Sequence, residues 1–161
     1  MSTLAKAPWQ VAFAATTAIV VGVAYGVSAL LDIVYSGDRL AVDARLDEYQ
    51  SVAGLEAASA DEIHEWMALS ATVFAVVAAV FIILGVLLWQ GVGRPGVRLT
   101  FTIAALVATV GSLVPLFLGT AKANAVTEDT VVFLLVVHVF ALVGALLLWA
   151  KSVRGWVLEQ P

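Results

Sequence analysis

Four long stretches without a single Asp, Glu, Lys or Arg constrain this chain more than any other feature. They cover about residues 8–31, 66–89, 99–121 and 130–150. Each reaches the roughly 20 helical residues that cross the ~30 Å hydrocarbon layer of a membrane. Because a helix satisfies its own backbone hydrogen bonds in lipid and an open strand does not, the stretches favour helices. We therefore predict an all-α protein, a four-helix transmembrane bundle that forms a single domain over residues 1–161.

Composition agrees with this class. Hydrophobic residues make up 62% of the 161 residues and charged residues only 12%, whereas soluble domains are about 45–50% apolar and about 25% charged. There is no cysteine, which excludes disulfides, thiolate metal sites and a cysteine nucleophile. We also expect no nucleic-acid binding.

Charges on either side of the four stretches predict their orientation. One set of flanks carries five cations and one acid, Glu159; the cations are Lys6, Arg94, Arg98, Lys151 and Arg154. The other eleven acids follow the first stretch or precede the second and fourth. Since Lys and Arg near the ends of spans stay in the cytoplasm, both termini are expected to be cytoplasmic. This pattern predicts a multi-pass protein of a prokaryotic plasma membrane.

The loop of residues 32–65 is the only long segment outside the predicted spans. Leu40, Leu46, Tyr49 and Val52 recur there at helical spacing, which predicts a short amphipathic helix on the outer face. Ser59 and Glu62 match a capping box, so the second long helix is expected to begin near Ala60.

Acidic residues are concentrated in the same loop. Asp43, Asp47 and Glu48 are expected to share one helix face, and they form either a docking face for a basic partner or simply a solvated surface. A loosely held cation is a further alternative, although the glycine and terminal glutamate of an EF-hand are missing.

Small residues within the spans predict close helix contacts, because lipid offers no hydrophobic drive for helix association. Gly22-x-x-x-Gly26 lies in the first stretch, and Gly111, Ser112 and Pro115 lie in the third. These residues are candidates for packing inside the bundle or for an interface with a partner. We expect the Gly22–Gly26 stripe to be the surface left for another subunit.

His138 is the one readily ionisable side chain inside a predicted span, and such a residue suggests function by default. A structural role is also available, because Pro115 frees the carbonyl of Gly111 at nearly the same depth, close to the Ser112 hydroxyl. The imidazole is therefore either a tie between the third and fourth helices or a functional group. The functional alternatives are a haem ligand, a quinone or lipid contact, and a proton relay.

The layout resembles the small four-helix membrane proteins of actinobacteria. The likeness rests on the short basic N-terminus, the acidic loop after the first stretch, and the turn Leu87-Leu88-Trp89-Gln90-Gly91-Val92-Gly93-Arg94. It implies a four-helix membrane fold; most of these proteins are uncharacterised, and some resemble accessory subunits of respiratory complexes. It carries over no site residue.

Function is predicted from these features together. We expect a non-catalytic integral membrane subunit or assembly factor of a larger membrane complex, with the respiratory complexes as the first candidates. The expected partners are membrane lipids and other integral membrane subunits or copies of the same chain, and no cofactor is expected. The first alternative is a small oligomeric transporter or channel, and the second is a haem- or quinone-binding redox protein that acts through His138.

Overall fold

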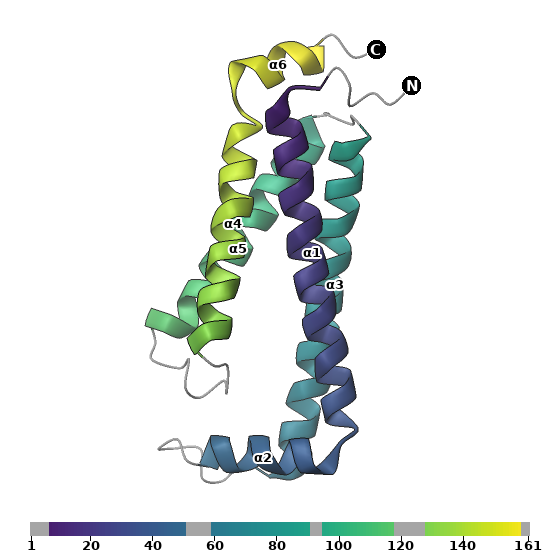
Figure 1. Cartoon of the computed structure of the whole chain (residues 1–161), viewed down its shortest axis with the longest axis vertical. Coiled ribbons are helices and arrows are strands. Elements are labelled where there is room, and N and C mark those ends of the chain that lie inside the picture. Colours follow the sequence, from purple (N-terminus) through teal and green to yellow (C-terminus); the bar gives the residue numbers. More distant parts are fainter. Residues whose placement is uncertain (1–6, 51–58, 91–94, 118–127, 159–161) are drawn as a thin grey trace.

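The computed structural model describes residues 7–50, 59–90, 95–117 and 128–158, and these residues form α-helices with no strand. The helices are α1 (Trp9–Ser36), α2 (Arg39–Gln50), α3 (Ala60–Trp89), α4 (Pro95–Phe117), α5 (Glu128–Leu147) and α6 (Lys151–Leu158). The all-α prediction is confirmed. Figure 1 shows α1, α3, α4 and α5 along the long axis, with α2 across one end and α6 across the other.

Two of these helices are long and apolar enough to cross a membrane. They are α1 and α3, with 28 and 30 residues; at about 1.5 Å per residue both exceed the ~30 Å of hydrocarbon. Shorter apolar helical segments occupy Pro95–Gly111 and Leu135–Leu147. The predicted stretch 66–89 therefore lies within α3, and the stretch 8–31 lies within α1 except for its first residue, Pro8, which is the N-cap. Residues 118–121 of the third stretch lie outside the described part of the chain.

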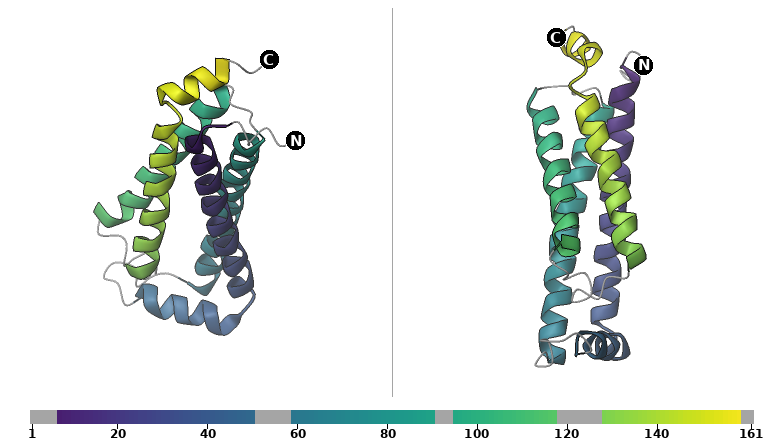
Figure 2. Two further views of the ribbon diagram at one scale, coloured as in Figure 1. Left: turned by 45° about the horizontal axis from the view of Figure 1, so that its top comes forward. Right: turned by 90° about the vertical axis from the view of Figure 1, so that its left-hand side faces the viewer.

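Helix α1 lies between two neighbours. It packs against α3 along much of its length and against α5 on another side, and α4 packs against α5. The second view in Figure 2 shows the long helices side by side. The main core is built from small residues of α1, among them Ala14, Ala15 and Ala18, together with larger rings such as Phe81 and Phe101.

The short helix predicted in the loop 32–65 is present as α2, but its register differs from the prediction. Leu40 is 79% exposed, whereas Val42 and Leu46 pack against Ile63 and Met67 of α3. Asp38 accepts the backbone N–H of Leu40 at 3.0 Å and so begins the helix, as aspartate favours at an N-cap. The apolar face of α2 therefore packs against α3.

The start of α3 confirms the predicted capping box. The backbone N–H of Ser59 donates to Glu62 Oε2 at 2.8 Å, and the N–H of Glu62 donates to Ser59 Oγ at 3.3 Å. Close by, His64 Nδ1 lies 3.1 Å from the carbonyl oxygen of Ser36, which ties α3 to the end of α1.

Helix α6 was not predicted from the sequence. The fourth stretch was expected to continue to residue 150, but α5 ends at Leu147 and the chain turns before Lys151. Val153 and Trp156 of α6 are buried in the main core, while Lys151 and Arg154 are exposed. This arrangement makes α6 a short amphipathic helix.

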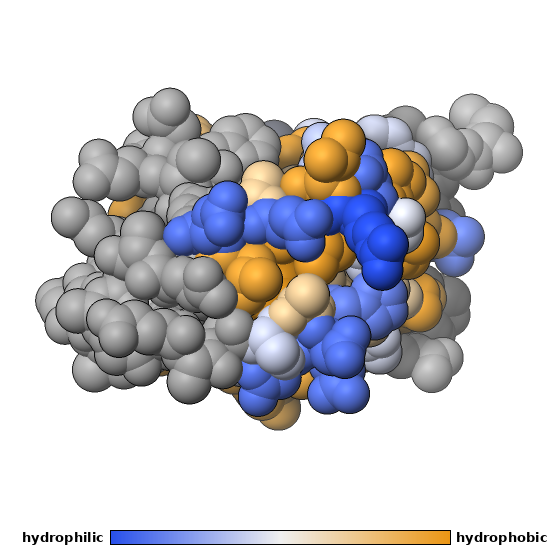
Figure 3. Space-filling model, turned by 90° about the horizontal axis from the view of Figure 1, so that it is seen from below, coloured by the Kyte–Doolittle hydropathy of each residue, from blue (hydrophilic) through white to orange (hydrophobic). Residues whose placement is uncertain are grey.

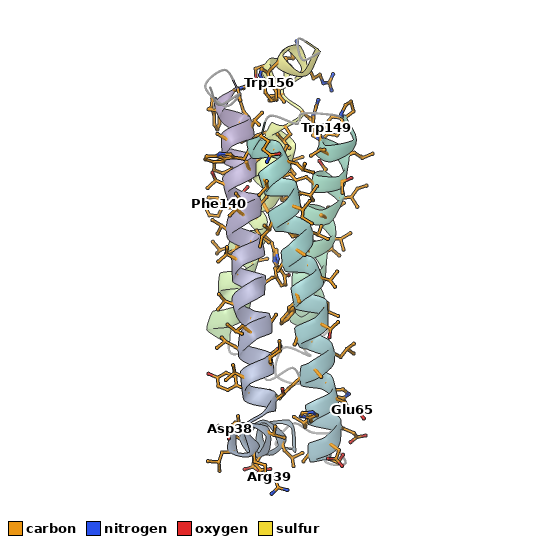
Figure 4. All side chains as sticks on the ribbon, turned by 90° about the vertical axis from the view of Figure 1, so that its right-hand side faces the viewer. Asp38, Arg39, Glu65, Phe140, Trp149 and Trp156 are labelled. Carbon is orange, nitrogen blue, oxygen red and sulfur yellow. The ribbon has the colours of Figure 1, made fainter. Side chains whose placement is uncertain are left out.

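The two ends of the molecule differ in chemistry. Figure 4 places Trp149 and Trp156 at the α6 end and Asp38, Arg39 and Glu65 at the α2 end. Seen from the α2 end, in Figure 3, hydrophilic residues gather over the described surface, with apolar residues between them.

Candidate functional site

Four side chains, one from each long helix, meet around His138. The imidazole of α5 is fully buried, and its Nε2 lies 2.9 Å from the hydroxyl oxygen of Tyr25 on α1. Phe74 of α3 packs edge-on against the Tyr25 ring, with 5.4 Å between the ring centroids. Thr109 of α4 donates to the carbonyl oxygen of His138 at 3.3 Å. The centre therefore joins all four helices.

The hydrogen bond of His138 defines what its ring can do. Either the phenol donates to Nε2 or the Nε2–H donates to the phenol oxygen, depending on the tautomer. In both cases Nδ1 is buried and has no hydrogen-bond partner among the described residues. One ring nitrogen is thus occupied by a neighbouring helix, and the other remains available.

Haem ligation does not fit this arrangement. An iron atom would need a ring nitrogen with open space in front of it, but the His138 ring is 0% exposed and its Nε2 faces the phenol.

The partner of His138 differs from the two that the sequence suggested. Tyr25 was not predicted as its partner. A signal for the pairing was present: Tyr25 lies six residues before the predicted outer end of its stretch, and His138 lies eight residues after the outer end of its own. Their similar depth in the predicted spans makes a contact possible, but the sequence does not show that α1 and α5 are neighbours. The Ser112 and Pro115 side chains lie outside the described part.

The Gly22–Gly26 stripe does not face outward as expected. A Cβ added at Gly22 would lie 2.6 Å from Ile82 Cγ1 and 2.9 Å from the carbonyl oxygen of Ala78, both on α3; one at Gly26 would lie 3.8 Å from the Ala78 Cβ. The stripe is therefore used for packing inside the chain, which is one of its two predicted roles, and not as the outward surface that we expected. Gly111, in contrast, faces open space within the described structure.

The predicted acidic docking residues lie on α2. Asp43 and Asp47 are both exposed, on a helix held to α3 through Val42 and Leu46. The side chain of Glu48 lies outside the described part. Two carboxylates are therefore displayed on a fixed element at the α2 end.

Comparison with protein-family models, with curated proteins and with solved structures finds no match for this chain. The functional argument therefore rests on the residues themselves.

Proposed function

We propose that this chain is a multi-pass membrane protein with four spans and cytoplasmic termini, and that it serves as a non-catalytic subunit or assembly factor of a larger membrane complex. The observation that carries the proposal is the Tyr25–His138 contact of 2.9 Å. Because of this contact, His138, the side chain that most suggested a chemical function, links α1 to α5. A respiratory complex is the proposed setting.

The charge distribution supports the orientation. The cations Arg98, Lys151 and Arg154 lie near the α6 end, together with Trp149 and Trp156. Cations near the ends of spans favour the cytoplasmic side, and tryptophans favour the membrane interface. Long exposed apolar side chains on α3, α4 and α5 suit contact with lipid or with another subunit; they include Leu69, Val76, Ile83, Ile103, Val107, Phe140 and Leu146.

Helix α2 provides the proposed docking element for a partner. Its carboxylates at Asp43 and Asp47 are exposed, and its attachment to α3 holds them in place. A displayed charge mainly accelerates association and selects partners of opposite sign, and its effect falls with salt. The proposed partner therefore presents a basic surface on that side of the membrane.

Mild-detergent extraction from native membranes, followed by native gel separation and mass spectrometry of the band, tests the proposal. We expect migration with other membrane subunits in a fixed ratio. The Asp43→Asn/Asp47→Asn double variant should weaken that association at low salt, while Asp61→Asn, an exposed acid at the same end but on α3, should not. Migration as a small homo-oligomer would favour the transporter or channel instead.

A quinone-binding redox protein is the second candidate, and one observation favours it. The buried Nδ1 of His138 has no hydrogen-bond partner among the described residues, so a quinone carbonyl that displaces the side chains covering the ring can accept a hydrogen bond from it. Extraction of the purified protein with organic solvent, followed by chromatography for quinones, tests this candidate. A quinone present at one per chain in wild type and lost in His138→Leu would move it to first place.

A further inference from the structure

Arg98 is a buried cation near the start of α4. Only 5% of its surface is exposed, and its Cζ lies 4.7 Å from the centroid of the Trp149 ring. Its Nε and Nη2 are buried and have no hydrogen-bond partner within the described structure. Buried polar groups are normally hydrogen-bonded, and two unused donors on one guanidinium therefore indicate a missing acceptor.

The electrostatic surroundings of Arg98 make an anion the fitting acceptor. Burial, and then repulsion from Arg154, lowers the pKa of Arg98 from its ordinary value. No carboxylate lies among the described residues of this end, so they offer the guanidinium the Trp149 ring but no negative charge.

The Trp149 ring holds the guanidinium in a defined orientation. Its indole N–H donates to the Thr102 hydroxyl at 3.0 Å, and that hydroxyl donates to the backbone carbonyl of Arg98 at 2.8 Å. These bonds hold the ring beside Arg98, with its face toward the guanidinium carbon, where a cation–π contact is favourable. The planar guanidinium suits a phosphate group, which it can bind with two parallel hydrogen bonds.

We infer that Arg98, with Arg154 beside it, binds the phosphate of a lipid headgroup at the α6 end. A lipid fits better than free phosphate because half-exposed apolar side chains follow Arg98 along α4 and precede Trp149 along α5: Leu99, Ile103 and Leu146. Acyl chains can cover these side chains while the headgroup reaches Arg98. Basic pockets on the cytoplasmic side of membrane proteins bind anionic lipids in this way. The inference rests on the proposed membrane placement.

Native mass spectrometry of the delipidated full chain, titrated with phosphatidylglycerol, tests the inference. We expect one bound lipid per chain, with diacylglycerol, which lacks the phosphate, binding at least about tenfold more weakly because the charge-assisted hydrogen bonds are lost. Arg98→Gln should weaken phosphatidylglycerol binding by about tenfold or more and Arg98→Lys by less, because lysine lacks the bidentate fork. Lys151→Gln, an exposed cation at the same end, is the matched control and should change affinity by about twofold or less.

Other outcomes overturn the inference. Equal binding of diacylglycerol and phosphatidylglycerol would show that the phosphate does not contribute to binding. Displacement of the lipid by inorganic phosphate at equal concentration would show that the site binds free phosphate rather than a lipid headgroup. If Arg98→Gln does not fold, Arg154→Gln provides the same test from an exposed position, and unchanged affinity there would count against the site. Glu159, the one acid beyond the end of α6, is tested with Glu159→Gln. If it neutralises Arg98, the variant should bind phosphatidylglycerol more tightly than wild type, and this result would overturn the assignment.

Membrane placement is measured separately by carbonate extraction. A protein that stays in the membrane pellet but binds no phosphatidylglycerol would overturn only the lipid site. A protein that carbonate releases would overturn the proposed function as well.

Discussion

Helix α1 is held on two sides by different means. Toward α3 the contact is apolar, and each helix contributes one glycine. Gly22 fits against Ala78 and Ile82, and Gly85 of α3 fits against Ala15 and Ile19 of α1. Toward α5 the contact combines one glycine, Gly144, with the polar pair Tyr25–His138. The first side permits closer approach of the two backbones, and the second adds one directional bond.

The difference between the two sides explains how a chain rich in apolar residues specifies which helices are neighbours. In the proposed membrane placement, lipid tails are as apolar as leucine, so burial alone does not select a neighbour for α1. Steric fit chooses α3, because a glycine on each helix admits the other backbone. A hydrogen bond in an apolar surrounding chooses α5, because few other partners exist there for an imidazole or a phenol.

The largest expected effect is at the α1–α3 contact. An alanine Cβ at Gly22 would lie 2.9 Å from a backbone oxygen, and one at Gly85 would lie 3.0 Å from another. Since backbone atoms move less easily than side-chain tips, Gly22→Ala and Gly85→Ala should each lower the free energy of unfolding by about 1–3 kcal/mol. Unfolding in mixed detergent–SDS micelles measures this loss.

Two glycines of the same chain serve as matched controls. A Cβ at Gly26 makes only an ordinary contact at 3.8 Å, and one at Gly111 meets open space in the described structure. Gly26→Ala and Gly111→Ala should therefore be neutral, or slightly stabilising because alanine is the better helix former. If all four variants lose equal stability, the steric account of the α1–α3 contact fails.

Local features were predictable from the sequence to the extent that they depend on neighbouring residues. The Ser59–Glu62 capping box and the start of α3 at Ala60 were predicted and are confirmed. Helix α2 was predicted as well, but Leu40 was placed on its buried side, and Val42 takes that role. The hydrophobic spacing allowed both choices, and only the position of α3 decides between them.

Features that depend on helix adjacency were not predictable. The small-residue stripe at Gly22 was visible, but the sequence does not state which helix meets it, so a contact with α3 was taken for a subunit interface. His138 was recognised, but Tyr25 became its partner only because α1 packs beside α5. Arg98 was read as a topology signal alone, since its burial beside Trp149 requires the ends of α4 and α5 to meet.

The next effect in size is at Gly144, where α5 meets α1. An added Cβ would lie 2.8 Å from the Thr17 hydroxyl oxygen and 3.1 Å from Ala14 Cα. The nearest backbone atom is farther away than the 2.9 Å at Gly22, so Gly144→Ala should cost about 1 kcal/mol, less than Gly22→Ala. The double variant Thr17→Ala/Gly144→Ala should recover part of this loss in the same unfolding assay. A Gly144→Ala loss larger than that of Gly22→Ala would reverse the ranking of the two sides.

The polar link between Tyr25 and His138 should contribute less. Hydrogen bonds between helices in membranes average about 0.6 kcal/mol in double-mutant cycles. A cycle of Tyr25→Phe, His138→Leu and the double variant should give a coupling energy of about that size. His138→Gln, which keeps a polar group, should lose less stability than His138→Leu. Coupling near zero would mean that the pair does not select α5 as the neighbour of α1.

The smallest effect is expected at Thr109, which extends the comparison to α4. Its hydroxyl donates to the carbonyl of Ala105 in its own helix at 2.7 Å and to the carbonyl of His138 at 3.3 Å. Because the shorter bond is intrahelical, the contact with α5 is the weaker of the two, and Thr109→Val should lose less than about 0.6 kcal/mol. Thr72→Val is the matched control, since Thr72 bonds only the carbonyl of Ala68 in its own helix among the contacts seen, at 2.9 Å, and is exposed. The difference between the two variants measures the α4–α5 bond itself. A Thr109→Val loss above that of His138→Leu would mean that α4, rather than α1, holds the imidazole in place.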